Sequence, residues 1–230
     1  MAPAAVAGPH PAQSALWPMQ SRARVAFVPG EKGSSRRICQ RLFGRCLAAW
    51  QYAGLAGAPD RARVEIGCAG DALSLEMDDP VAAVYWAVFY ARPAAGGVEL
   101  LNDGLRIHPH AMRRRGLGTH IFHRQRANAT ALGVRQIVLT AGRGNDENGY
   151  YTWPRFGFDG PLPAAIRGAL PADLESAHSV LDLFESEPGR RWWRNHGVGL
   201  PLVFDLSPGS RSQQVFERYV HARIRTAPQC

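Results

Sequence analysis

A short run of arginines and glycines between residues 113 and 118 is the part of the sequence best suited to chemistry. It reads Arg-Arg-Arg-Gly-Leu-Gly, after an apolar run that ends near Pro109 and before a helical pattern that begins at Thr119. Because glycine has no Cβ, the backbone at Gly116 and Gly118 can turn tightly and bring successive amide N–H groups to one anion at the start of a helix. The arginines add positive charge and further donors. The sequence therefore predicts a phosphate-binding turn.

The segments on either side of this turn predict a strand, loop, helix and strand unit. Apolar residues recur at helical spacing after the turn, and Gly133 is placed to end that helix. The apolar runs Val98 to Ile107 and Ile137 to Leu139 are typical of strands. We expect these two strands to be parallel, because the helix between them is the crossover that parallel pairing needs.

The spacing Arg113-x-x-Gly116-x-Gly118 resembles the pyrophosphate-binding signature of the GNAT N-acetyltransferase superfamily. A second block agrees in order and spacing, because residues 148–158 read Asn-Gly-Tyr-Tyr-Thr-Trp-Pro-Arg-Phe-Gly-Phe and end in an aromatic-Gly-Phe corner. The resemblance covers about Val98 to Asp159. It implies an α/β (α+β) fold, with a mixed twisted sheet, a splayed pair of parallel central strands and flanking helices. The implied reaction is direct transfer of an acetyl group from acetyl-CoA to a primary amine on a small molecule, peptide or protein.

The resemblance also implies which residues hold acetyl-CoA as co-substrate. Backbone amides of the turn would bind the pyrophosphate, an arginine would lie near the 3′-phosphate, and the strand before the turn would follow the pantetheine arm. The expected cofactor-binding residues are Ile107, His108, Arg113, Arg114, Arg115, Gly116, Leu117, Gly118, Thr119 and Asn148. The stretch before the motif is about one residue longer than usual, which leaves the backbone register open by one residue. A nicotinamide site is not indicated, because the chain lacks G-x-G-x-x-G and the acidic residue that follows it.

Acetyl transfer to an amine needs a base for the ammonium and an acid for the leaving thiolate. Glu99 and Asp103 are the candidate bases, since their even spacing on one strand predicts a shared face unless a bulge intervenes. Exposed hairpin charges are the alternative for both, and above all for Asp103, which stands beside Gly104. The usual position of the acid tyrosine in the superfamily holds Trp153, so Tyr151, and after it Tyr150, are the candidate acids. The alternatives are that both tyrosines pack in the core or that CoA leaves unassisted; Pro154 should break the usual helix here.

Metal chemistry is not expected. Four histidines surround the turn, but no cysteine or carboxylate completes a ligand set at a recognisable spacing. We interpret them as surface residues of a basic helix: His108, His110, His120 and His123. The cysteines are widely spaced and fit neither a disulfide nor a zinc framework: Cys39, Cys46, Cys68 and Cys230.

Composition predicts one domain with extensions. The chain has 230 residues, 46% of them hydrophobic, and its net charge of +8 comes almost wholly from arginine. That skew is typical of a GC-rich coding sequence, and with the unpaired cysteines it leads us to expect a bacterial cytoplasmic protein, a secreted effector being the alternative. No apolar run is long enough for a membrane span. We expect a flexible tail over residues 1–29, an acetyl-CoA-binding core over 30–160 and an extension over 161–230.

The remaining elements follow from periodicity and turn signals. We expect one helix over Ser34 to Ala53, and strands over 63–68, 72–77 and 81–91. In the extension we expect a helix over 172–185, a short helix over 190–195, a strand over 202–206 and a helix over 212–224. This extension is longer than the superfamily's usual finish, so it should complete the sheet and cap the substrate side or form an interface, including one between two copies of the chain.

Two other functions stay open. A catalytically weak or inactive GNAT-fold module that binds CoA or a partner protein would explain Trp153 and Pro154. A nucleic-acid-binding domain comes third and is the less expected, since it depends on net charge and on the segment Arg190 to Asn195. Its adjacent tryptophans are more often packing residues, one buried and one half-buried. The sequence does not identify the acceptor amine.

Overall fold

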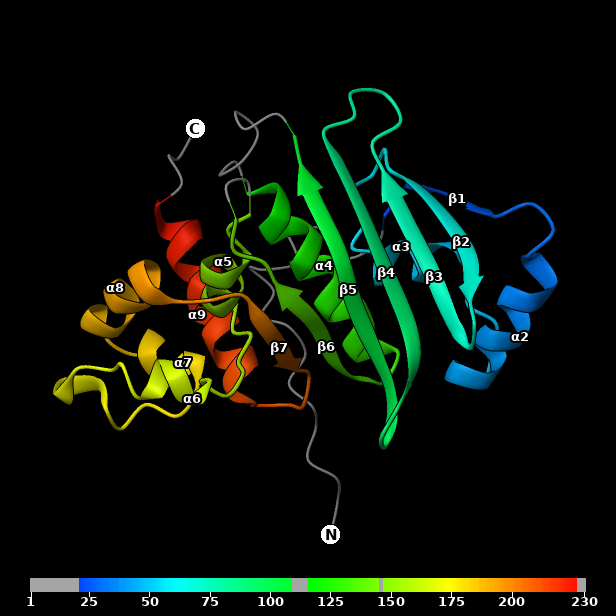
Figure 1. Cartoon of the computed structure of the whole chain (residues 1–230). Coiled ribbons are helices and arrows are strands. Elements are labelled where there is room, and N and C mark those ends of the chain that lie inside the picture. Colours follow the sequence, from blue (N-terminus) through cyan, green and yellow to red (C-terminus); the bar gives the residue numbers. More distant parts are fainter. Residues whose placement is uncertain (1–20, 109–115, 145–146, 227–230) are drawn as a thin grey trace, which may run out of the picture. The chain divides into compact units, whose positions relative to one another are not determined.

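The fold is a mixed sheet of seven strands with flanking helices, as the sequence predicted. The computed structural model describes residues 21–108, 116–144 and 147–226 (Figure 1). The strands run in chain order across the sheet: β1 (Arg24–Phe27), β2 (Arg63–Ala69), β3 (Ala72–Asp78), β4 (Tyr85–Ala94), β5 (Gly97–Ile107), β6 (Val134–Ala141) and β7 (Leu200–Asp205). The helices are α2 (Lys32–Phe43), α3 (Ala49–Leu55), α4 (Leu117–Ala131), α5 (Gly149–Arg155), α6 (Ala164–Arg167), the 3₁₀ turn η2 (Ala172–Leu174), α7 (Val180–Phe184), α8 (Glu187–His196) and α9 (Arg211–Thr226).

The chain divides into two compact units, and each unit combines two stretches of sequence. The first holds the described residues up to Val88 together with Leu105 to Leu132. The second holds Phe89 to Gly104 together with the described residues from Gly133 onward.

In the first unit, β1 is parallel to β2, and β2 is antiparallel to β3. The inward-facing residues Leu73, Leu75 and Met77 of β3 are fully buried, which is the period-two pattern of a strand with one face on the core. Helices α3 and α4 pack closely, and a Cβ at Gly54 would overlap the side chain of Asn128, so the absence of a side chain at Gly54 permits this approach.

Two expectations for the first unit are wrong. Residues 24–27 fall in the expected flexible tail, yet they form β1 and pair with β2. The single helix expected from Ser34 to Ala53 is two helices, because Gly44 ends α2 with a left-handed φ of 68° and the chain then restarts as α3 at Ala49. The apolar periodicity continued across this break and concealed it.

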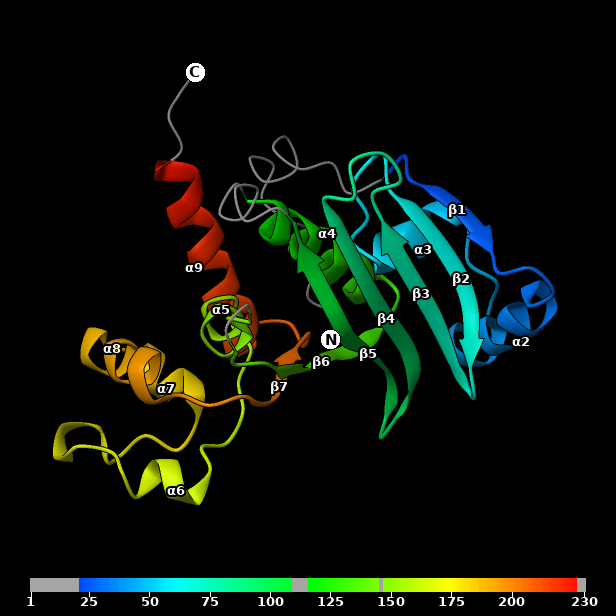
Figure 2. The same ribbon diagram turned by 45° about the horizontal axis from the view of Figure 1, so that its top comes forward.

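In the second unit, β5 and β6 form the predicted parallel pair, and β7 joins β6 in antiparallel register. Strand β5 continues to Ile107, whereas its register with β6 ends at Asn102 and Leu139. Aromatic rings fill the space under these strands: Trp153 lies 5.1 Å from Phe158, and Phe158 lies 5.4 Å from Phe204, centroid to centroid. Helices α5, α7, α8 and α9 of this unit form one group (Figure 2).

Two further helix expectations in the second unit need correction. The helix expected over 172–185 is the turn η2 followed by α7, which begins only where Ser179 accepts a hydrogen bond from the Asp182 amide. Pro154 does not break α5, which runs to Arg155. The strand over 200–205 and the last helix from Arg211 agree with the sequence prediction to within two residues.

Candidate functional site

The start of α4 has the backbone needed for an anion. Gly116 precedes the helix with a φ of 86°, and among the described residues other than its chain neighbours no atom lies within 4 Å of the place where a Cβ would stand there. The first turn of this helix carries no acidic side chain, so its positive end is not neutralised locally. Leu117 and Gly118 are half-buried and Thr119 is buried. Arg113, Arg114 and Arg115 lie outside the described residues.

The end of β5, the strand that leads to this helix, is fixed by one backbone hydrogen bond. The backbone N–H of His108 donates to the carbonyl oxygen of Val84 at 2.6 Å, so this amide is not available to polarise a thioester. Ile107 is half-buried, and its Cδ1 lies 3.6 Å from the position of a Cβ on Gly118. The end of β5 therefore lies against the first turn of α4, through Ile107 rather than His108.

The two candidate bases on β5 have different surroundings. Both carboxylate oxygens of Glu99 are engaged, because Arg92 Nε donates to Oε1 at 2.7 Å and Gln136 Nε2 donates to Oε2 at 2.8 Å. Glu99 is buried, whereas Asp103 is exposed beyond the last residue paired with β6. Both oxygens of Glu99 are thus used within the structure, whereas the Asp103 side chain is open to solvent.

The two candidate acids are both held by α8. Tyr150 donates its hydroxyl proton to the Arg194 carbonyl oxygen at 2.9 Å, while Arg194 Nη2 donates to the Tyr151 hydroxyl oxygen at 2.6 Å. Tyr150 thus uses its proton within the structure, and Tyr151 receives a bond and can donate its own. Asn148, expected to contact the cofactor, is exposed at the start of α5.

The histidines on α4 are not surface residues, contrary to the sequence interpretation. His123 is buried, and burial, followed by the nearby charges of Arg126, His120 and Arg124, lowers its pKa to about 4. Burial also lowers the pKa of half-buried His120. No group of three or more His, Cys, Asp or Glu side chains within the described ranges could hold a metal ion.

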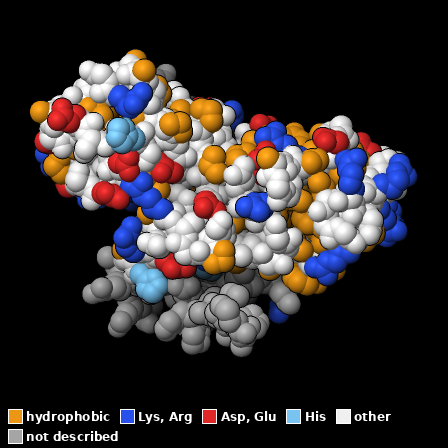
Figure 3. Space-filling view, turned by 90° about the horizontal axis from the view of Figure 1, so that it is seen from below, with side chains coloured by type: hydrophobic (Ala, Val, Ile, Leu, Met, Phe, Trp, Pro, Cys, Tyr) orange, Lys and Arg blue, Asp and Glu red, His pale blue; other side chains and the backbone are white. Residues whose placement is uncertain are grey.

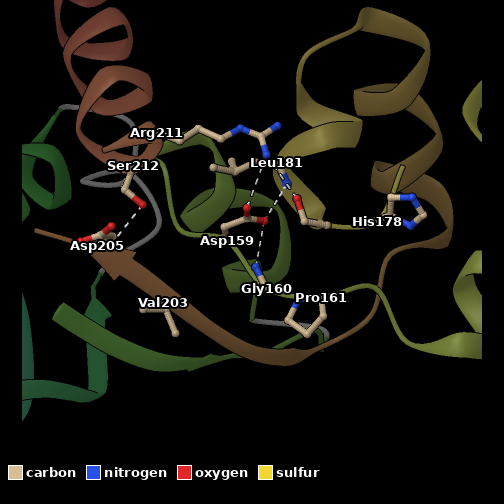
Figure 4. Close-up of a pocket in the computed structure, with 10 residues that line it drawn as sticks. Asp159, Gly160, Pro161, His178, Leu181, Val203, Asp205, Arg211 and Ser212 are labelled. Atoms are coloured by element: carbon tan, nitrogen blue, oxygen red, sulfur yellow. Dashed lines mark hydrogen bonds and ion pairs between the residues drawn. The ribbon is translucent and has the colours of Figure 1, made fainter. Parts of the chain in front are cut away.

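A pocket of about 460 Å³ opens between β7, the start of α9 and the loop before α7 (Figure 4). Its polar groups bind one another: Arg211 Nη1 lies 2.8 Å from Asp182 Oδ1, and Asp159 Oδ1 accepts from the amides of Gly160 and Leu181. Partial burial alone would raise the pKa of Asp182, but hydrogen bonds from the amides of His178 and Ser179 and from Arg211 lower it. This network joins α9 to α7 and is structural.

Charged side chains are distributed unevenly over the face of the molecule that Figure 3 shows. In Figure 3, Lys and Arg side chains gather at the right-hand end, where Figure 1 places α2. That helix carries Lys32, Arg36, Arg37 and Arg41. At the other end of the view, acidic and basic side chains are mixed. Among the helices that the structure describes, none has the length and apolar character of a membrane span.

Sequence reasoning missed the contacts that Arg194 and Arg211 make with other helices. Arg194 belongs to a segment whose tryptophans were expected to pack, and this expectation is confirmed: Trp193 is buried and Trp192 is half-buried. The sequence offered no signal that Arg194 would donate a hydrogen bond to Tyr151, which lies 43 positions earlier.

Comparisons with known proteins find a likeness among solved structures. No family model matches the chain, and no curated protein sequence matches it. Among solved structures, the loading GNATL domain of CurA from Lyngbya majuscula is similar, with 14% identity, coverage of 58% of this chain and 76% of that chain, and a TM-score of 0.30. The functional assignment therefore depends on the residues of this chain.

Proposed function

We propose that this protein is an N-acetyltransferase that moves the acetyl group of acetyl-CoA directly to a primary amine. The observation that carries the proposal is the start of α4, where a left-handed glycine, a second glycine and an acid-free first turn follow three arginines in sequence. Backbone N–H groups at a helix start, together with the helix dipole, favour bound phosphate. The sequence resemblance to the GNAT superfamily supplies the identity of the phosphate-bearing cofactor.

The residues at this helix start fit a pyrophosphate. The open space at Gly116 lets a phosphate oxygen approach the backbone, and Gly118 exposes the amide of the second helical residue. Arg113, Arg114 and Arg115 would add charge-assisted hydrogen bonds. Acetyl-CoA, when bound, supplies a thioester whose carbonyl carbon accepts the amine.

In the proposed chemistry one residue takes a proton from the attacking amine, and another gives a proton to the leaving thiolate. Asp103 accepts a proton from the ammonium, so that the neutral nitrogen can form a bond to the carbonyl carbon while the C–S bond breaks; the nitrogen then releases its second proton to solvent to give the amide. Tyr151 donates its hydroxyl proton to the departing thiolate. The Arg194 guanidinium, which lies 2.6 Å from the Tyr151 oxygen, then faces the phenolate and stabilises its charge. Tyr150 and Glu99 hold neighbouring elements in place.

A pair of substitutions at Gly118 tests cofactor binding. A Cβ there makes an ordinary contact with Ile107, so both Gly118→Asp and Gly118→Asn should be accommodated. A carboxylate in the first turn interacts favourably with the helix dipole and so stabilises the helix, but it repels a bound pyrophosphate. We expect Gly118→Asp to weaken acetyl-CoA binding about tenfold or more in calorimetry, and Gly118→Asn to weaken it much less. If the unaltered protein does not bind acetyl-CoA, the proposal is wrong.

A second candidate function keeps the cofactor without the reaction. Trp153 occupies the usual acid position, and the proton of Tyr150 is used by Arg194. A module that binds CoA without transfer would show calorimetric binding, but no CoA release with a broad panel of amines. Under the transferase proposal, at least one amine releases CoA, and Tyr151→Phe slows that release while acetyl-CoA affinity is kept.

A further inference from the structure

Arginine and tyrosine side chains alternate along a row across α5, α8 and α9 of the second unit. The arginine–tyrosine row consists of Arg194, Tyr151, Arg155, Tyr219 and Arg223. Each guanidinium carbon stands near a ring centroid: Arg194 at 4.7 Å and Arg155 at 5.8 Å from Tyr151, and Arg155 at 5.5 Å and Arg223 at 5.4 Å from Tyr219. Three helices that are separate in sequence thus contribute to one continuous surface feature.

Two arginines of the row, Arg155 and Arg194, carry positive charge that no ion pair with a described carboxylate offsets. Arg155 and Arg194 are exposed, and neither forms an ion pair with a carboxylate of the described part of the chain. Glu187, the acidic residue of α8, pairs with Arg190 instead. On α9, Glu217 is exposed and is the acidic residue closest in sequence to Tyr219.

One more arginine extends this surface. Arg143 lies 4.9 Å from the ring centroid of Tyr150, which in turn lies 6.3 Å from Tyr151. Its guanidinium donates to the backbone carbonyl oxygens of Gly197 and Asn195, which are neutral acceptors. Arg143 therefore retains its positive charge while its position is fixed.

Stacking on a ring holds a guanidinium plane in place and leaves N–H groups at its edge. A prearranged guanidinium loses less side-chain entropy when it binds, and its planar set of donors matches phosphate oxygens. Guanidinium faces also stack on bases, a contact that an acidic peptide does not use. A series of such groups suits a ligand with phosphates at intervals and bases between them.

We propose that the arginine–tyrosine row, with Arg143 at its end, binds a single-stranded nucleic acid through its phosphates and bases. The chain's net charge of +8 favours the encounter with a polyanion. The row shares Tyr151 and Arg194 with the proposed catalytic group, so the test substitutes Arg143 and Arg155, which the proposed acetyl transfer does not use.

The test uses the full-length protein and a fluorescein-labelled oligothymidine of about 16 nucleotides, with binding followed by anisotropy over a range of salt concentrations. We expect Arg143→Gln/Arg155→Gln to weaken binding about tenfold and to make the dependence on salt less steep. Arg167→Gln, an exposed arginine on α6 outside the row, is the control and should change affinity little. Arg155→Lys keeps the charge but loses the planar stack, so it should also weaken binding.

Three outcomes would overturn the inference. The first is no binding of the oligonucleotide at low salt. The second is an equal loss in Arg167→Gln and in the double variant, which would mean that net charge alone is responsible. The third is displacement of the oligonucleotide by a polyglutamate peptide at similar concentration, which would identify an acidic peptide as the ligand. Thermal unfolding of each variant separates loss of binding from loss of fold.

Discussion

Trp193 donates a hydrogen bond from Nε1 to the carbonyl oxygen of Tyr150, at 2.9 Å. In a regular helix this carbonyl would accept from the amide four residues later, but that residue is Pro154, which has no N–H. An indole from α8 therefore replaces the hydrogen bond that the proline removes. This explains why α5 continues through Pro154, and it fixes α8 beside the two tyrosines.

We predict that Trp193→Phe destabilises the protein by about 2–4 kcal/mol. The substitution removes the donor to Tyr150 and leaves space around a fully buried side chain. Trp192→Phe is the matched control, because Trp192 is half-buried and stacks on His196 at 4.9 Å. Urea unfolding at neutral pH measures both variants. Equal losses in the two would contradict the role given to the indole N–H.

The stability of the protein should fall on the acid side of neutrality because of His123. Its pKa is about 4 in the folded protein, below the usual value of about 6.5 that it regains on unfolding. Between these values the unfolded state binds more protons, so the free energy of unfolding decreases as pH falls from 7 toward 4. The largest loss from this residue is about 3 kcal/mol. Urea unfolding at several pH values should show this loss of unfolding free energy in the parent protein and a smaller loss in His123→Gln. The control is His178→Gln, at an exposed site, in which the unfolding free energy should depend on pH as it does in the parent protein.

Asp182 should contribute stability that disappears in stronger acid. Its pKa is lowered in the folded protein, so the contribution is present above the unfolded value near 4 and is lost as pH falls through the folded value. We expect Asp182→Asn to cost about 1–3 kcal/mol at pH 7, because Arg211 and two backbone amides lose a charged acceptor. The difference from the parent should narrow below pH 4. Asp173→Asn, at an exposed site, serves as control, and a comparable loss there would refute the assignment.

Local patterns were sufficient to predict most strands and the helix after the turn. The parallel pair β5 and β6, the end of α4 at Gly133 and the last helix all follow from apolar periodicity and glycine placement. These features depend on residues that are close together in sequence, and for that reason they could be predicted. The turn at Gly116 was predicted for the same reason.

Tertiary contacts could not be predicted in this way. Pro154 indicated a helix break because the donor that replaces its missing N–H, the Trp193 indole, lies on another helix 43 positions after its acceptor Tyr150, and nothing in the sequence connects them. The histidine at position 123 looked like a surface residue, since polarity alone does not show that α4 buries this face. The pairing of Glu99 with Arg92 and Gln136 likewise depends on strand register.

The division of the chain has a consequence for its synthesis on the ribosome. The second unit begins with Phe89 to Gly104, which is translated before the first unit's last segment, Leu105 to Leu132. During that interval Val98 to Asn102 lacks its β6 partner, so an unpaired strand edge exists in the nascent chain until residues 134–139 emerge. Neither unit is a continuous stretch, so stopping translation at any single codon cannot yield either one complete without part of the other.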